Sequence, residues 1–428
     1  QNLPNDSHHV SISPKNRPSM AALLAPICIV LVALTVRLPL LDAPGFMHDQ
    51  EQFIIWAYVA QENGLAGVYE FVETSGDPRR LSNYPPVQIY ICRALAALYP
   101  TVAGRPLDAE VIASVGDRAR TTEALAAYTL FKWPAVMADV ACALLLFYGI
   151  RRRTTVAFAG LVALIFAMLP NVWHNSAVWG AVDSLPVMFL MAALECITRK
   201  RTGWMGVFAA LAVLTKPQTI IFIPVFIIVA IRDNHVPRAR SLATGAIAAL
   251  ITTSAIIVPF HGAFGGVWDA YLGAPGFYPL THLNGFSAWF LGAPLLESHL
   301  QDNLLEYYVR DDVGLVAGIT ARQLGVVAFL AFACFSFYRL WVRGTDSCAL
   351  RCCVRMVPLA FFVCSTQMHE RYLYPVVAMW AWSATPTWRW LAGYCAISLA
   401  AAVNVLWVWL GPFDSVAVQH LSRALHRP

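Results

Sequence analysis

Long apolar runs, separated by short polar stretches, dominate this chain of 428 residues. Each run is apolar enough to predict a helix that crosses or enters a membrane. The runs number eleven and cover residues 21–41, 125–150, 155–170, 184–198, 204–215, 219–231, 242–260, 323–341, 355–367, 372–386 and 390–410. Several are shorter than the roughly 20 residues that a straight span requires, so their ends must extend into flanking sequence. The pattern predicts an all-α polytopic membrane protein with about eleven transmembrane helices.

Composition supports this class. Hydrophobic residues make up 58% of the chain and charged residues 13%, with a mean hydropathy of +0.58. A soluble domain is closer to half apolar and a quarter charged. The ten cysteines lie mostly inside apolar runs and form no CxxC pair, so neither a disulfide framework nor a zinc site is expected. The basic clusters are short and adjoin the apolar runs, which gives no support to nucleic-acid binding.

Positive charge decides the expected topology. Arginine and lysine cluster at 151–153, 199–201, 232–240 and 339–355. If the ambiguous apolar segment 84–99 spanned the membrane, these clusters would lie outside, whereas an interfacial segment leaves them all inside. The second arrangement agrees with the preference of positive loops for the cytoplasm.

The expected organisation is therefore a single transmembrane domain at 20–410 between polar tails at 1–19 and 411–428. Its first outer loop, residues 42–124, is long and carries interfacial helices. No signal peptide is expected ahead of the first span, which begins near Met20.

This topology gathers a set of polar stretches on one face of the membrane, while loops on the other face are short and basic. The stretches are HDQEQ (48–52), NYPP (83–86), WGAVD (179–183), TKPQ (215–218), HG (261–262), THLN (281–284) and MHERY (368–372). We expect this face to carry out chemistry or binding. The chain has no internal repeat, which weakens a transporter interpretation.

Asp49 lies just beyond the first apolar run. If 49–62 is a helix, Asp49, Phe53 and Trp56 share a face, whereas Glu51 points elsewhere. Asp49 is then either a general base near the membrane surface or the N-cap of an amphipathic helix. NYPP is best explained as a helix start, with proline in the first turn.

Asp183 and Lys216 each allow two interpretations. Asp183 ends WGAVD at the outer end of a span, where an acid is often functional or simply a helix cap. TKPQ interrupts two short apolar halves, and such a break is tolerated only inside protein or beside water. Lys216 therefore points into a polar cavity, where it would suit a phosphate, or snorkels from a hairpin turn.

MHERY is the densest polar stretch. Arg371 offers a planar donor fork that matches phosphate, His369 adds a second donor, and Glu370 can orient either one. Alternatively, Glu370 and Arg371 form an interfacial salt bridge. No P-loop, dinucleotide-binding glycine motif, HExxH or serine nucleophile elbow is present in the sequence.

In order and placement, these motifs resemble the GT-C superfamily of integral membrane glycosyltransferases. DQEQFIIW (49–56) and NYPPVQIY (83–90) look like the D-x-E-x(4)-W and YPPL signatures of the dolichyl-phosphate-glucose-dependent glucosyltransferases of the endoplasmic reticulum. TKPQ resembles a Lys-Gln pair of that family. MHER is similar to its His-x-His-Glu-Lys stretch, with Arg371 at the lysine position and Gln367 in place of the first histidine. WGAVD and THLNGFSAW look more like bacterial relatives predicted to use polyprenyl-phosphate mannose.

The resemblance implies an inverting transfer of a hexose from a polyprenyl monophosphate to an acceptor hydroxyl. Asp49 would be the catalytic base, while Glu51 and Asp183 would support the acid chemistry or bind the acceptor. Lys216, His369 and Arg371 would bind the donor phosphate, whose developing negative charge needs cations and hydrogen-bond donors. Further motif residues would orient or bind substrate: Trp56, Tyr84, Gln218, Asn284 and Glu370.

The same resemblance implies the partners and the location. No cofactor or metal is expected, because the donor has one phosphate and the carboxylates do not cluster in the sequence, although some GT-C relatives use a divalent ion. The acceptor would be a glycan, a lipid or a protein. A bacterial cytoplasmic membrane with the site facing outside is preferred, with the endoplasmic reticulum as the alternative. Two rival functions are a transporter or flippase of a lipid-linked sugar, and a ligase that uses a polyprenyl-diphosphate glycan.

Overall fold

The computed structural model describes residues 20–70, 82–232, 237–273, 278–299, 304–305, 308–345 and 347–410. Within these residues almost all regular structure is helical, so the predicted all-α class is confirmed. The expected polar tails, 1–19 and 411–428, lie outside the described residues.

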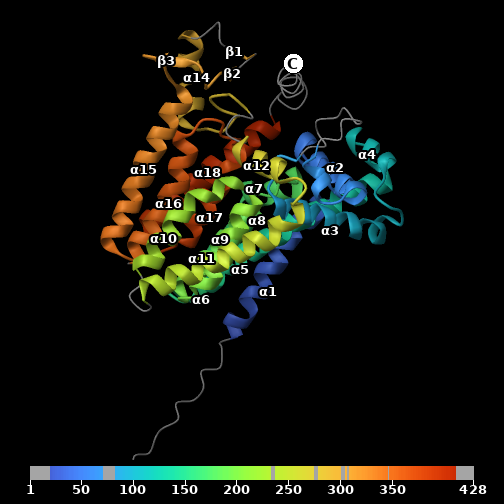
Figure 1. Ribbon diagram of the computed structural model, residues 1–428. Helices are drawn as coiled ribbons and strands as arrows, with labels where there is room; N and C mark the ends of the chain where they lie inside the picture. The colour runs from blue at the N-terminus through green and yellow to red at the C-terminus, as the bar shows by residue number, and fades with distance from the viewer. Residues whose placement is uncertain are drawn as a thin grey trace, which may run out of the picture.

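The chain forms a bundle of long helices with short turns at their ends (Figure 1). The helices up to Thr215 are α1 (Met20–Arg37), α2 (Met47–Asn63), α3 (Pro86–Ala103), α4 (Ala109–Gly116), α5 (Thr122–Ile150), α6 (Val156–Met168), α7 (Pro170–Trp173), α8 (Ser184–Thr198) and α9 (Thr202–Thr215). Those that follow are α10 (Ile223–Arg232), α11 (Arg238–Ile257), α12 (Phe264–Leu272), α14 (Ala288–His299), α15 (Ala321–Arg343), α16 (Ser347–Cys364), α17 (Tyr374–Trp382) and α18 (Trp388–Leu410).

Short helical turns connect several of these helices. They are η1 (Leu38–Leu40), η2 (Ala66–Val68), the π-helical turn η4 (His174–Trp179), η5 (Pro217–Phe222), η6 (Val258–Phe260) and η8 (Glu370–Leu373). Two small antiparallel pairs complete the fold: β1 (Leu304–Leu305) with β2 (Tyr308–Val309), and β3 (Gly314–Val316) with β4 (Ile319–Thr320). With α14 they form a lobe above the bundle in Figure 1.

Each of the eleven predicted apolar runs contains a helix. Among the described residues, five helices are long and apolar enough to cross a membrane alone, namely α1, α5, α11, α15 and α18, if η1 and η6 count with α1 and α11. A sixth candidate is the bent pair formed by 156–168 and 170–179, whose two parts meet at 54°. The remaining runs form shorter helices, such as α8 and α9, that pack against these longer ones.

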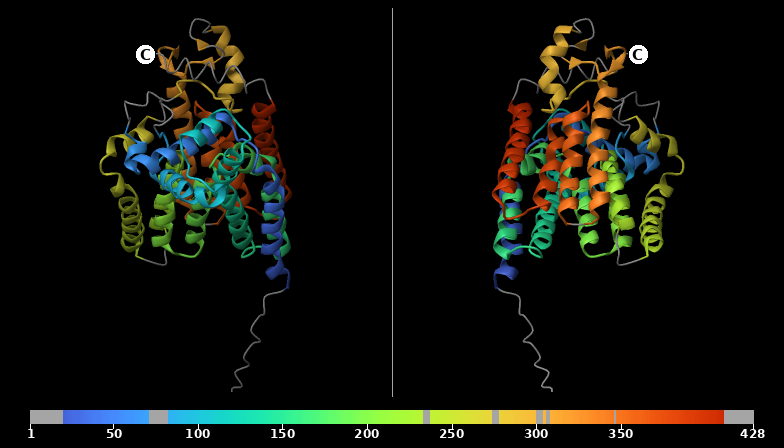
Figure 2. Two further views of the ribbon diagram at one scale, coloured as in Figure 1. Left: turned by 90° about the vertical axis from the view of Figure 1, so that its right-hand side faces the viewer. Right: turned by 90° about the vertical axis from the view of Figure 1, so that its left-hand side faces the viewer.

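In the described parts of the predicted first outer loop, the α-helices are α2, α3 and α4. α2 packs on α3, and α3 packs in turn on α5 of the bundle. Figure 2 shows these blue and cyan helices lying across the upright helices of the bundle. α3 covers residues 86–99 of the ambiguous apolar segment 84–99, and it is not among the helices that are long and apolar enough to span a membrane.

A buried ion pair ties four parts of the bundle together. Arg37 of α1 donates from Nε and Nη2 to Asp139 of α5 at 3.0 and 2.9 Å, and both side chains are fully buried. Asp139 also accepts from Ser176 in η4 at 2.5 Å and from the Tyr374 hydroxyl in α17 at 2.6 Å. A buried charge is tolerated only when paired and hydrogen-bonded, so this network fixes η4 and α17 relative to the long helices.

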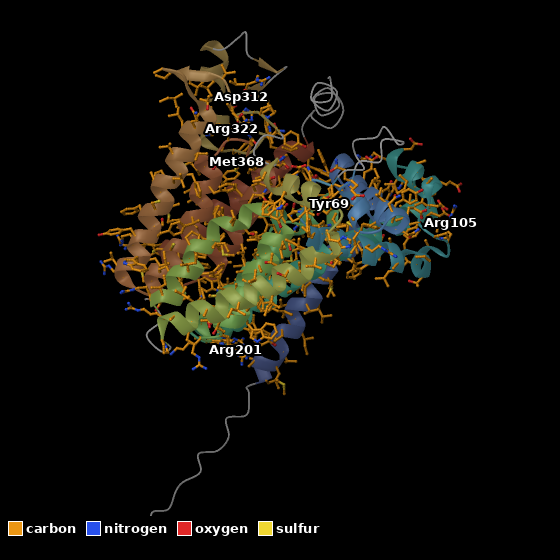
Figure 3. All side chains as sticks on the ribbon, in the orientation of Figure 1. Tyr69, Arg105, Arg201, Asp312, Arg322 and Met368 are labelled. Carbon is orange, nitrogen blue, oxygen red and sulfur yellow. The ribbon has the colours of Figure 1, made fainter. Side chains whose placement is uncertain are left out.

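The two ends of the bundle differ in chemistry. α8 begins beside Asp183 and ends beside Arg199 and Arg201, and 15 residues of helix separate these ends by roughly 22 Å. Figure 3 shows Arg201 at the opposite end from Met368, which precedes His369. We call the end with Asp183 and Met368 the site end, and the end with Arg201 the basic end.

Candidate active site

Asp49 lies in the first turn of α2 and is not its N-cap. The N-cap is Phe46, whose backbone N–H donates to the Trp179 carbonyl at 2.8 Å. Gln50 is buried and donates from Nε2 to the Tyr128 carbonyl at 2.9 Å, which fixes the start of the helix against α5. The cap interpretation of Asp49 is therefore wrong, and its carboxylate is available for other partners.

Those partners come from distant parts of the chain. The indole Nε1–H of Trp179 donates to Oδ2 of Asp49 at 2.6 Å. The Arg371 guanidinium lies against both carboxylate oxygens, with Nη1 3.2 Å from Oδ2 and Nη2 3.3 Å from Oδ1. The Asp49 side chain keeps 20% of its surface exposed, the most of any acid in this cluster. A reacting group can therefore approach it.

Arg371 is the centre of the cluster. Its Nη1 donates to Glu370 at 2.9 Å, its Nε lies 3.4 Å from Asp183, and its guanidinium stands 5.4 Å from the centroid of the Trp179 ring. Burial alone would lower the pKa of Arg371, but the three surrounding carboxylates outweigh it and raise the pKa well above its ordinary value. Arg371 therefore remains a permanent cation in a nearly dry site.

Asp183 pairs with Lys216 across the break between α9 and η5. Asp183 occupies the N-cap position of α8 but makes no side-chain cap hydrogen bond, so the plain-cap interpretation is wrong. Its Oδ1 instead accepts from Nζ of Lys216. Burial would raise the pKa of Asp183, but the Lys216 and Arg371 cations outweigh it and hold that pKa below its ordinary value.

The break at TKPQ is present, as the sequence predicted. α9 ends at Thr215, Lys216 is extended at φ −152° and ψ 124°, and Pro217 opens η5. The Lys216 side chain is 9% exposed and its Nζ lies 4.8 Å from the centroid of the Tyr372 ring and 5.8 Å from that of Tyr84. Lys216 therefore points into the protein and does not snorkel to the surface.

Glycine at position 180 lets the WGAVD turn bring Trp179 and Asp183 to the same site. Gly180 has φ +81°, a left-handed conformation that side chains rarely adopt. A Cβ atom there would also press on the Gln50 side chain at 3.2 Å. The turn can therefore place the Trp179 indole on Asp49 and the Asp183 carboxylate on Lys216.

An apolar cleft opens beside this cluster. It is partly open to solvent. Asp183, Lys216, Gln218 and Tyr372 supply polar groups at its wall. The rest of the lining is mostly apolar and comes from α8, η5, α16 and α17: Pro186, Val187, Leu190, Ile221, Phe222, Pro358, Phe361 and Pro375.

Three further residues predicted for the site, His369, Glu370 and Gln218, lie at the charged cluster or at the cleft beside it. His369 is beside Glu370, with Nδ1 3.8 Å from Oε2, and its ring packs on Tyr372. Burial would raise the pKa of Glu370, but the neighbouring His369 ring and the charge of Arg371 outweigh it and hold that pKa below its ordinary value. Gln218 lines the cleft.

Three predicted residues are set back from the charged cluster. Trp56 is fully buried behind Tyr84, with ring centroids 5.6 Å apart, so it supports that tyrosine and does not line the cleft. Glu51 is buried near Gly116 of α4, away from Arg371. Asn284 contacts its neighbours through its backbone. Its carbonyl accepts a hydrogen bond from the Asn404 side chain at 2.7 Å, and it forms an isolated β-bridge with His369.

Sequence reasoning missed two aromatic contacts of the cluster. Trp179 had been quoted only as part of a motif, and it donates to Asp49; Tyr372 borders Lys216. For Tyr372 the signal was its position directly after Arg371, because aromatic faces attract cations. For Trp179 it was the indole N–H, a donor four positions before Asp183 in the same motif. The Arg37–Asp139 pair was also missed, although an ionisable residue inside an apolar run is itself a signal.

The cluster combines three carboxylates, Asp49, Asp183 and Glu370, with two cations, Lys216 and Arg371. An anion entering the site would find hydrogen-bond donors but would compete with Asp49 and Asp183 for them. Among the described residues, no group of three or more His, Cys, Asp or Glu side chains is placed to hold a metal ion. The cluster thus places a partly exposed carboxylate, Asp49, beside two nearly buried cations.

Comparison with known proteins identifies the family. No curated protein matches the chain. The family model for glycosyltransferase family 87 matches residues 121–366, more than half of the chain. The matched segment contains Asp183 and Lys216, while Asp49 and Arg371 lie outside it. The helical bundle and the family match together show that this chain belongs to glycosyltransferase family 87 and is a membrane glycosyltransferase of the GT-C type.

Proposed function

We propose that this protein transfers a hexose from a polyprenyl monophosphate to an acceptor hydroxyl, with inversion at the anomeric carbon. The observation that carries the proposal is the contact of the Asp49–Arg371–Asp183–Lys216 cluster with the apolar cleft. A lipid-linked phosphate has the same two parts, a charged head and an apolar chain. The basic end would lie in the cytoplasm and the site end outside, in a bacterial cytoplasmic membrane.

The donor phosphate would bind between Lys216 and Arg371. Both cations are nearly buried, with 9% and 7% of their side chains exposed, so their charges are weakly screened. The guanidinium presents a planar fork that suits phosphate oxygens, and His369 and Gln218 lie close by. The isoprenoid chain would occupy the cleft walled by Val187, Leu190 and Ile221.

Asp49 would act as the base. The acceptor hydroxyl gives its proton to the Asp49 carboxylate as its oxygen forms a bond to the anomeric carbon. The bond from that carbon to the phosphate oxygen breaks, and its electron pair leaves with the phosphate, which Lys216 and Arg371 stabilise. A single displacement of this kind inverts the configuration.

In the structure, Arg371 holds Asp49. A phosphate that competes for the guanidinium frees the Asp49 carboxylate for the acceptor. Donor binding thus prepares the base. Trp179 keeps its indole hydrogen bond to Asp49 at 2.6 Å and would hold the carboxylate in place during this exchange.

The experiment is a transfer assay with purified protein in detergent. Short-chain polyprenyl-monophosphate hexoses are offered beside matched diphosphates, together with a mixed extract of glycan, lipid and protein acceptors. The proposal expects consumption of at least one monophosphate donor with release of the lipid phosphate. Turnover of the diphosphates alone would favour the ligase, and binding without turnover of either would favour a transporter.

A further inference from the structure

A buried aspartate joins the lobe above the bundle to the segment that carries His369 and Arg371. Asp311 follows β2 and is fully buried. Its Oδ1 accepts from Nη2 of Arg322 at 2.6 Å, and its Oδ2 accepts from Nε of the same residue at 3.1 Å. Figure 3 shows Arg322 above Met368 at the site end. One arginine thus compensates the charge of Asp311.

The same carboxylate also binds the turn that precedes MHERY. Oδ2 of Asp311 accepts from the Thr366 hydroxyl at 2.7 Å and from Nε2 of Gln367 at 2.8 Å. Gln367 has φ +63°, which is uncommon for a residue other than glycine. Such a conformation persists only where surrounding contacts hold it. Asp311 is therefore one of the contacts that hold this turn in shape.

Backbone contacts from residues 283–285, which precede α14, continue along the segment. The N–H groups of Leu283 and Gly285 both donate to the Met368 carbonyl, at 3.0 and 2.9 Å. A side chain at Gly285 would collide with that carbonyl, so glycine is required for the close approach. Together with the hydrogen bonds from Asp311, these bonds hold residues 366–368 in place. That segment comes shortly before Arg371, which lies in the charged cluster.

We propose that Asp311 is a positioning residue for the active site. By binding Thr366 and Gln367 it fixes the direction in which His369 and Arg371 reach Asp49 and Asp183. The proposal rests on the function proposed above, because it assigns Arg371 to the donor phosphate. Asp311 itself contacts neither Asp49 nor Lys216 and acts only through the turn.

The pattern of contacts separates this role from plain stabilisation of the lobe. Arg322, in the first turn of α15, would alone satisfy the charge of Asp311 and join the lobe to that helix. The two further hydrogen bonds instead cross to residues 366 and 367, outside the lobe. A misplacement of about 1 Å in a catalytic constellation reduces the rate roughly 100-fold, so a small tilt of this turn has a large effect on turnover.

The main test compares Asp311→Asn with Asp312→Asn. Asparagine has the same shape but one acceptor oxygen and no charge. If that oxygen takes the place of Oδ2 and keeps Thr366 and Gln367, the amide –NH2 faces Nη2 of Arg322; in the other orientation the –NH2 faces Thr366 and Gln367, so asparagine cannot hold the arginine and the turn together. We expect kcat per folded molecule to fall about 10- to 100-fold, more than KM for the donor rises. Asp312 is exposed and pairs with Arg310 on the same lobe, so its variant is a matched control with ordinary turnover.

Hydrogen exchange of full-length protein gives a second readout that needs no activity. Asp311→Asn is expected to speed exchange of the backbone amides of 366–371, whereas Asp312→Asn leaves them unchanged. Ordinary kcat together with ordinary exchange at 366–371 in Asp311→Asn would overturn the proposal. If wild type transfers no sugar, the function proposed above fails, and exchange alone decides whether Asp311 holds the turn.

Two further variants keep the proposal falsifiable if Asp311→Asn does not fold. Thr366→Val removes one hydrogen bond, and Gln367→Gly removes the other while allowing the positive φ without strain. Each is expected to lower kcat about 3- to 10-fold with a near-ordinary melting temperature, and the double variant to lower it further. Full turnover in the double variant would contradict the positioning role.

Discussion

Nη2 of Arg371 lies 3.3 Å from Oδ1 of Asp49, although the two residues are 322 positions apart. The first belongs to η8 near the end of the chain and the second to α2 near its beginning. Because Arg371 also reaches Asp183, whose other oxygen binds Lys216, one guanidinium connects the candidate base to the candidate phosphate site.

Removing Lys216 should destabilise the fold through Asp183. Lys216→Met leaves a buried carboxylate with Arg371 as its remaining ionic partner, at 3.4 Å. We expect a loss of about 1–3 kcal/mol in the free energy of unfolding. The double variant Asp183→Asn with Lys216→Met should be closer to wild type, because no lone charge stays buried. Thermal unfolding in detergent measures both, and equal losses in the two variants would contradict the pairing.

Acid should weaken the fold through the same carboxylates. The pKa values of Asp183 and Glu370 are lowered in the folded protein. Their contribution is therefore complete above their ordinary pKa values near 4 and is lost as pH falls through the lower folded values. Melting temperatures measured from pH 7 to 3 should fall steeply below about pH 4, and Asp183→Asn should flatten that fall. An unchanged slope in the variant would count against the role of Asp183.

A bulkier side chain in the cleft should raise KM more for donors with a long isoprenoid chain than for donors with a short one. Ile221 lines the cleft and is partly exposed, so Ile221→Trp adds bulk without disturbing the charged cluster. We expect KM for a long polyprenyl donor to rise about tenfold, the loss of roughly 1.4 kcal/mol of binding. A donor with one or two isoprene units should be nearly unaffected. Equal effects on long and short donors would place the lipid chain elsewhere.

Much of the fold could be predicted from the sequence because membrane helices appear in it as long apolar runs. Every predicted apolar run contains a helix, since residues in a bilayer must satisfy their backbone hydrogen bonds within the segment. The polar interruptions were equally informative. Asp49, Asp183, Lys216 and Arg371 each stand where an apolar run breaks, and the structure brings all four together.

Contacts between residues far apart in the chain could not be predicted from the sequence. Nothing in the order of residues says that Asp49 would bind the Trp179 indole, or that Asp311 would bind Thr366. Those contacts depend on how the helices and the lobe pack. The Arg37–Asp139 pair was hidden for another reason, because two isolated charges barely change the hydropathy of their long apolar runs.

The most direct test of the account compares Asp49→Asn with wild type in the transfer assay. Glu62→Gln, an exposed change on the same helix, is the matched control. Asparagine keeps the shape and accepts the Trp179 hydrogen bond but cannot take a proton. The account predicts that kcat falls by roughly 10²- to 10⁴-fold while binding of the polyprenyl-phosphate donor is retained. Turnover within a few-fold of wild type would contradict it and remove Asp49 from the mechanism.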